Sequence, residues 1–326
     1  MRKVLLPLMV LALMLTITTK AKAIDNNTVI ITYDGSTATV EIADNISQYV
    51  TVSSGTSSHV QLVQSSDFAG VDATADNEDG EIIYQLSGSS EDGEFYMEGS
   101  FKCTLELKGL TLTNPSGPAI NIQNGKRIEV SAKKGTTNTL TDGANTDYNG
   151  CYHCKGHTKF KGKGELNVVG NSKHAVYSKE YIEVKNLTLN ITDAVKDAIH
   201  CKEYFLMESG IINITGAGKN GITVELSGNT STGVIAGHED EDTGNFYQED
   251  GTLAISGYGN KAIVADGTIS YNGGTQDFDT NDTSGVNGVK SKTETKNGDS
   301  YDLLGRQVKN PAKGVFIQNG KKYVRQ

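Results

Sequence analysis

The sequence lacks several features that would place it in a common protein class. Acidic residues outnumber basic ones and give a formal net charge of -9. This argues against nucleic-acid binding, because proteins of that class carry a positive excess that captures phosphates. Long helical periodicity is missing, tryptophan is absent and proline is scarce, whereas strand-forming residues and 37 glycines dominate with Asn, Asp and Ser. This composition predicts an all-β protein rather than a disordered or helical one.

The N-terminus has the pattern of a targeting segment. Arg2 and Lys3 precede an apolar run over residues 4–17, and Ala21-Lys22-Ala23 fits a small-x-small cleavage site. No lipidation-type cysteine follows, and no later apolar run is long enough to span a bilayer. We expect a signal peptide that is cleaved near Ala23, no transmembrane segment, and a mature protein that is secreted or held at the cell surface.

A step of 23 or 24 residues recurs in the middle of the chain. Its equivalent positions are Tyr152, Val176, Ile199 and Ile222, and the next is Ile263 after an acidic insertion. A period in the low twenties, built from strand-type residues, indicates a solenoid, because one coil cannot bury its apolar face and must stack on the next. The pattern resembles an all-β, right-handed parallel β-helix of about 23 residues per coil.

The rest of the chain divides around these coils. We expect a signal peptide at 1–23, an N-terminal β cap at 24–95, the β-helix at 96–275, a polar linker at 276–300 and a short C-terminal β segment at 301–326. The cap is expected because an open solenoid end exposes apolar side chains and unpaired strand edges.

The C-terminal segment resembles the sorting signal of Bacteroidetes type IX secretion. The resemblance rests on Tyr301-Asp302-Leu303-Leu304-Gly305-Arg306, on Gly314-Val315-Phe316-Ile317 and on Asn319-Gly320-Lys321. It implies export through an outer-membrane secretion machinery, followed by surface attachment or release. A small independent β-tail is the alternative.

The coils resemble a family of bacterial carbohydrate-binding proteins built on a polysaccharide-lyase-like parallel β-helix. The resemblance rests on residues 117–122, 135–143 and 196–200, and on Gly210-Ile211-Ile212-Asn213-Ile214-Thr215. It implies binding of acidic or plant-type polysaccharide, with calcium on the acidic members of an Asp-Gly-Ile coil motif. In this chain only Asp197 keeps that acid, since His174 and Asn220 stand at the equivalent positions.

Side-chain alternation predicts which residues share the outer surface of neighbouring coils. If Tyr152 and its equivalents point inward, a basic-aromatic strip faces outward beside a second lysine column. The predicted carbohydrate-binding residues are Lys155, Tyr177, Lys179, His200 and Lys202 in the strip, and Lys173, Lys196 and Lys219 in the second column. Stacked ammonium groups repel one another, and an anionic polymer would reverse that sign. The alternative is a solvated face whose lysines pair with nearby acids.

Three further patterns have competing interpretations. Cys151, Cys154 and His157 have the residue types of a zinc cluster, but alternation puts the two cysteines on opposite faces of one strand, which favours buried thiols. The acidic insertion, with Asp240 and Asp242, could bind calcium through its carboxylates, and the alternative is a loop that is only solvated. Lys196 with Asp193 and Asp197 is the one compact candidate for a lyase base.

We therefore predict an exported polysaccharide-binding protein. A calcium-dependent polysaccharide lyase and a structural adhesin or stalk are the two alternatives. The candidate calcium ligands are Asp193, Asp197, Asp240 and Asp242.

Overall fold

The computed structural model describes residues 24–53, 57–68, 80–143, 147–228, 238 and 241–279, and four short strands between residues 300 and 325. The chain divides into two compact units, residues 1–285 and 286–326. The predicted signal peptide at 1–23 lies outside the described residues, as does most of the predicted linker.

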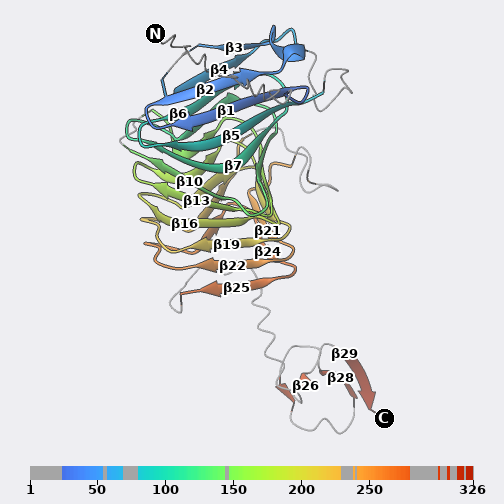
Figure 1. Cartoon of the computed structure of the whole chain (residues 1–326). Helices are drawn as coiled ribbons and strands as arrows, with labels where there is room; N and C mark the ends of the chain where they lie inside the picture. Colours follow the sequence, from blue (N-terminus) through green and yellow to red (C-terminus); the bar gives the residue numbers. More distant parts are fainter. Residues whose placement is uncertain are drawn as a thin grey trace, which may run out of the picture. The chain divides into compact units, whose positions relative to one another are not determined.

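The first unit is built from successive turns of three strands, and each strand pairs in parallel with its equivalent in the next turn (Figure 1). The equivalent strands form three faces. Face 1 contains β8 (Ile120–Asn124), β11 (Gly150–Cys154), β14 (His174–Ser178), β17 (Ile199–Lys202), β20 (Ile222–Glu225) and β23 (Ile263–Ala265). Face 2 contains β9 (Ile128–Ala132), β12 (Thr158–Gly162), β15 (Ile182–Lys185), β18 (Tyr204–Met207), β21 (Asn245–Gln248) and β24 (Ile269–Tyr271). Face 3 contains β10 (Thr137–Asp142), β13 (Glu165–Gly170), β16 (Thr188–Ala194), β19 (Ile211–Ile214), β22 (Thr252–Ile255) and β25 (Thr275–Phe278).

The N-terminal strands begin this stack and add antiparallel pairs to it. They are β1 (Thr28–Asp34), β2 (Thr37–Ile42), β3 (Val50–Val52), β4 (His59–Gln64), β5 (Ile82–Ser90), β6 (Glu94–Gly99) and β7 (Cys103–Asn114). The pairs β1–β2 and β3–β4 are antiparallel, whereas β1–β5, β4–β6 and β6–β8 are parallel. The long strand β7 pairs with both β9 and β10, and so joins face 2 to face 3. The all-β prediction with parallel sheets is confirmed, and the pairing is consistent with a solenoid.

The predicted register of the repeat is confirmed on face 1. Tyr152 pairs with Val176, Val176 with Ile199, Ile199 with Ile222, and Ile222 with Ile263 across the acidic insertion. All five side chains are fully buried. Each buried aliphatic side chain of this size contributes roughly 1.5–3 kcal/mol to folding, so one inward position repeated over the turns forms a continuous core.

The four cysteines are free thiols in this core. Cys103, Cys151, Cys154 and Cys201 are all buried, which confirms the interpretation as packed thiols. Strict alternation implied that Cys151 faces outward, but its side chain is fully buried. It lies at the start of its strand, opposite Ala175, in a row of small buried residues that includes Ala119 and Ala198.

These thiols are expected to be unreactive in the folded protein. Burial raises the pKa of Cys154 to about 11, so very little thiolate forms near neutral pH. We expect Ellman's reagent to label none of them in buffer and all of them in denaturant. Rapid labelling of any cysteine in the native protein would contradict this packing.

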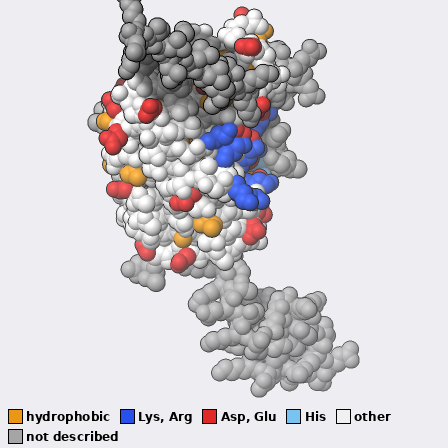
Figure 2. Space-filling model, in the orientation of Figure 1, with side chains coloured by type: hydrophobic (Ala, Val, Ile, Leu, Met, Phe, Trp, Pro, Cys, Tyr) orange, Lys and Arg blue, Asp and Glu red, His pale blue; other side chains and the backbone are white. Residues whose placement is uncertain are grey.

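Face 3 presents uncharged polar side chains. Asn167, Asn190 and Asn213 lie opposite one another on β13, β16 and β19. The amide of Asn190 donates to Asn167 at 2.9 Å, and that of Asn213 donates to Asn190 at 2.8 Å. In Figure 2 the surface over these strands is largely uncharged, with Lys and Arg side chains gathered at one margin. The charged columns predicted from the sequence therefore belong to another face.

The second unit contains four antiparallel strands in the order β27–β26–β28–β29. They are β26 (Ser300–Tyr301), β27 (Gln307–Val308), β28 (Gly314–Gln318) and β29 (Lys321–Arg325). Within the described ranges of both units, no helix has the length and apolar character needed to cross a membrane.

Candidate functional site

The outward positions of face 1 form a ladder of aromatic and imidazole rings, which we call the ring ladder: His153, Tyr177 and His200. They come from β11, β14 and β17, and the strand register places them directly opposite one another. The ring of Tyr177 stacks on His153 with centroids 5.2 Å apart and on His200 at 5.6 Å. The ladder arises because each parallel turn repeats the same outward position one strand spacing further on.

This stacking limits what the ring ladder can offer a ligand. Tyr177 has a neighbouring ring against each of its two faces, and Tyr177 and His200 are each only 9% exposed. Both faces of the Tyr177 ring are therefore covered by neighbouring rings, so a sugar would have to meet this residue at its edge. That Tyr177 and His200 bind carbohydrate stays a prediction.

Lysine columns lie on both sides of the ring ladder. On one side, Lys155 and Lys179 are exposed, and Lys202 is half-buried with its ammonium group 3.8 Å from Glu225. On the other side, the backbone nitrogen of Lys196 donates to Lys173 at 2.8 Å, and that of Lys219 donates to Lys196 at 3.0 Å. The structure thus brings the eight predicted carbohydrate-binding residues together on one face, and their role stays a prediction.

A cavity of about 350 Å³ adjoins the N-terminal end of the ring ladder. Its lining includes His59, Glu94, Tyr96 and Tyr148. Tyr96 pairs with Asn121, which pairs with His153, and the ring of Tyr148 lies 5.1 Å from that of His153. Phenol, imidazole and carboxylate groups around one hollow are suited to hydrogen bonds with sugar hydroxyls. Sequence reasoning missed this cavity, because its walls come from turns far apart in the chain.

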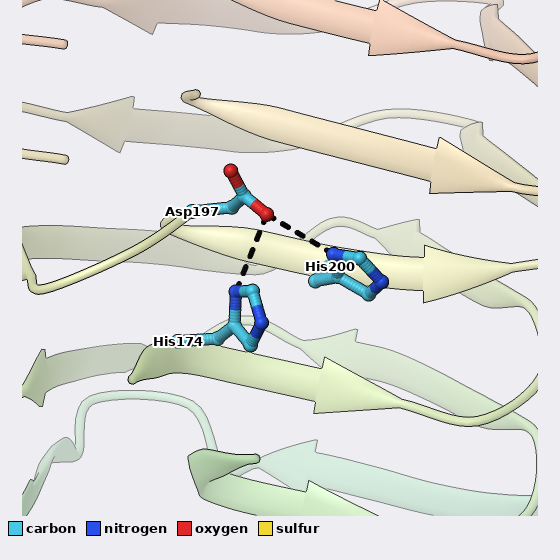
Figure 3. Close-up of side chains that lie close together, drawn as sticks. All are labelled: His174, Asp197 and His200. Carbon is cyan, nitrogen blue, oxygen red and sulfur yellow. Dashed lines mark hydrogen bonds and ion pairs between the residues drawn. The ribbon is translucent and has the colours of Figure 1, made fainter. Parts of the chain in front are cut away.

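Three buried side chains at the other end of the ring ladder form a cluster, which we call the His174 cluster: His174, Asp197 and His200 (Figure 3). Oδ2 of Asp197 lies 3.0 Å from Nδ1 of His200 and 3.4 Å from Nδ1 of His174. His174 and Asp197 occupy the same position in consecutive turns, so the 23-residue step brings them together. The sequence signal for the cluster was this shared position, together with His200 three residues after Asp197.

The titration of the His174 cluster follows from its burial. Burial lowers the pKa of His174 to about 3, and the nearby His200 adds to this effect against the attraction of Asp197. Burial by itself would raise the pKa of Asp197, but hydrogen bonding from His200 and the nearby imidazoles outweigh it, and the pKa is lowered. At neutral pH the cluster therefore holds a carboxylate beside a neutral His174.

A second cluster lies where face 1 turns into face 2 and contains His157, Glu180 and Glu203. Nε2 of His157 is 2.9 Å from Glu180 and 3.2 Å from Glu203. Burial by itself would lower the pKa of His157, but the two carboxylates outweigh it and raise that pKa to about 9. His157 is therefore a cation at neutral pH and is held by two anions, not by the cysteines near it in sequence.

Of the predicted calcium ligands, Asp197 alone belongs to a metal-type cluster within the described residues. Asp193 is exposed, Asp240 lies outside the described residues, and Asp242 is buried with Oδ1 accepting from the backbone of Ser227 at 2.7 Å. The carboxylate of Asp197 lies beside His200 and accepts from the backbone of Asn220, and its role with Lys196 in lyase chemistry stays a prediction.

Comparisons with known proteins agree with this architecture. A solved polysaccharide lyase-like protein from C. thermocellum, studied as a gadolinium derivative, is similar to 77% of this chain over 94% of its own length, with 20% sequence identity and a TM-score of 0.54. That likeness establishes a shared fold. A search of curated proteins gives no match. Residues 70–306 match the family described as carbohydrate-binding domain-containing protein. These residues include every turn of faces 1 to 3, and the chain therefore belongs to this carbohydrate-binding domain family.

Proposed function

We propose that this protein is exported and binds an acidic or plant-type polysaccharide along face 1. The observation that supports this most directly is the pair of lysine columns beside the ring ladder. Each column places one ammonium group on each of three successive turns, which are about 4.8 Å apart. An extended polyanion that crosses the turns would meet a positive group at each step.

Two lysines of face 1 favour an anionic ligand, whereas Lys202 lies 3.8 Å from Glu225. Within the described part of the chain, Lys155 and Lys179 have no acidic side chain at ion-pair distance. Their mutual repulsion persists in an otherwise acidic protein, and bound carboxylates would relieve it. The cavity lined by Tyr96 and Tyr148 would hold one sugar unit at the end of the same track.

Replacing Lys155 and Lys179 together with alanine tests the proposal. We expect affinity for a soluble polyuronate to fall roughly tenfold, which corresponds to about 1.4 kcal/mol. The binding of the unchanged protein should also weaken with added salt, because these ammonium groups are exposed. Isothermal titration calorimetry with the polyuronate and with a neutral β-glucan of similar length provides the measurement.

The matched control is the double substitution of Lys134 and Lys163. Both are exposed lysines at the corner between faces 2 and 3, so the same charge is lost away from the ring ladder. Equal weakening by the two double variants would mean that net charge, not face 1, determines binding. Release of unsaturated uronate products would favour the lyase alternative, and absence of glycan binding would favour the adhesin.

Export is the second part of the proposal. It is supported by the sequence patterns at residues 1–23 and 301–326. Deleting residues 301–326 should leave the protein folded but retained inside the outer membrane of a host with type IX secretion. Unchanged release of the truncated protein would identify the segment as an independent β-tail.

A further inference from the structure

We propose that the His174 cluster binds a divalent transition metal of the zinc type and not calcium. Calcium takes six to eight oxygen ligands, whereas two of the three donors here are imidazole nitrogens. Imidazole with one carboxylate is a donor set that suits zinc, copper or nickel. The calcium implied by the family resemblance therefore does not fit these residues. The inference concerns a different ligand from the glycan and does not depend on the proposed function.

The separations between donor atoms match a small coordination sphere. Oδ2 of Asp197 lies 3.0 Å from Nδ1 of His200 and 3.4 Å from Nδ1 of His174, and all three donors lie within 4.8 Å of one another. A tetrahedral site with metal–ligand bonds of about 2.0–2.1 Å has ligand–ligand separations of roughly 3.3 Å. Small side-chain rotations would therefore bring the three donors onto one ion, with a fourth position left for water.

The partners of these donors also resemble those of a metal site. Oδ1 of Asp197 accepts hydrogen bonds from the backbone and side-chain nitrogens of Asn220, both at 3.0 Å, and this leaves Oδ2 for the cluster. Nε2 of His200 lies 3.5 Å from Oε2 of Glu225. A metal-bound imidazole commonly donates its second N–H to a carboxylate, which fixes the ring and its tautomer.

One donor in the cluster has no hydrogen bond. Nδ1 of His174 is buried and forms none within the described structure, although it faces Asp197, and its side chain is only 9% exposed. A buried polar atom left without a partner destabilises the fold by about 1–3 kcal/mol. Coordination would satisfy this nitrogen, and the neutral imidazole has the lone pair that coordination needs.

Titration of the metal-stripped full-length mature protein with Co²⁺ and Zn²⁺ tests the site. Tetrahedral Co²⁺ gives an intense visible absorption band. The band reports the coordination geometry, and the titration reports the number of ions bound. We expect the unchanged protein to bind one equivalent that is lost in both His174→Gln and Asp197→Asn. Zn²⁺ should displace Co²⁺ and raise the melting temperature, whereas Ca²⁺ at the same concentration should do neither.

The matched controls are His153→Gln, on the neighbouring turn of the ring ladder, and His157→Gln, in the second cluster. Both should keep the equivalent assigned to the His174 cluster. Circular dichroism checks folding, and His174→Gln is the safer variant because Nδ1 of His174 forms no hydrogen bond. The proposal is overturned if the unchanged protein binds no Co²⁺, if His174→Gln keeps the full stoichiometry, or if Ca²⁺ displaces Co²⁺.

Discussion

Replacing Asn138 with alanine is expected to lower the free energy of unfolding of the first unit by at least about 2 kcal/mol. Asn138 lies on β10 and is fully buried. Its Oδ1 accepts hydrogen bonds from the backbone nitrogens of Gly109 and Leu110, both at 2.9 Å. Its Nδ2 donates to the backbone oxygen of Glu165 at 3.0 Å. One amide therefore joins three successive turns of the stack.

The size of the effect comes from what the substitution leaves behind. Gly109 has a φ of 83° and breaks the regular ladder of β7, so its N–H and that of Leu110 depend on this side chain. Alanine would orphan the buried N–H of Leu110 and the Glu165 acceptor, whereas the N–H of Gly109, an exposed residue, would turn to water. Each buried group without a partner destabilises by about 1–3 kcal/mol, whereas an exposed group would turn to water.

Urea denaturation of the alanine variant, followed by circular dichroism, measures this loss. Asn213→Ala is the matched control, because Asn213 is a half-buried asparagine on face 3 whose amide donates to the side chain of Asn190. We expect the control to lose less than about 1 kcal/mol. Similar losses in the two variants would show that the position of the amide does not matter.

The repeat could be predicted from the sequence, whereas the sites beside it could be predicted only in part. The burial of Val176 and Ile199 depends on strand alternation and on the period, and both can be read from consecutive residues. The same rule placed Lys155 and Lys179 on one face. Side-chain periodicity therefore predicted the core and the lysine columns together.

The other features of the site depend on side-chain directions, which the repeat period does not specify. Tyr177 was correctly placed outward, but the packing of its ring against two neighbours follows from the close spacing of the turns. His157 faces Glu180 and Glu203 because the chain bends after β11, and this ion pairing was not predicted from the sequence. The cavity beside Tyr96 needs the N-terminal strands in place. Each of these features depends on a corner or a contact between turns.

Raising the pH from 6.5 to 8.5 is expected to destabilise the first unit through His157. Its pKa is about 9 in the folded protein and about 6.5 in the unfolded chain. A raised folded pKa gives a stabilisation that is fully present below pH 6.5 and is lost as the pH rises through 9. Over this window the loss amounts to at most about 2 kcal/mol. Solvent near this side chain, which is 31% exposed, makes that an upper value.

The difference between the unchanged protein and His157→Gln isolates this contribution, since glutamine keeps a hydrogen-bond donor but does not titrate. Urea denaturation at pH 6.5, 7.5 and 8.5 should show a falling stability that becomes nearly flat in the variant. His153→Gln is the control with the opposite sign: burial lowers the pKa of His153 to about 4, so its contribution is lost as the pH falls below 6.5 and is constant above it. The His153→Gln variant should therefore lose as much stability between pH 6.5 and 8.5 as the unchanged protein. If His157→Gln also loses this stability, the effect belongs to other groups, such as thiols that ionise on unfolding.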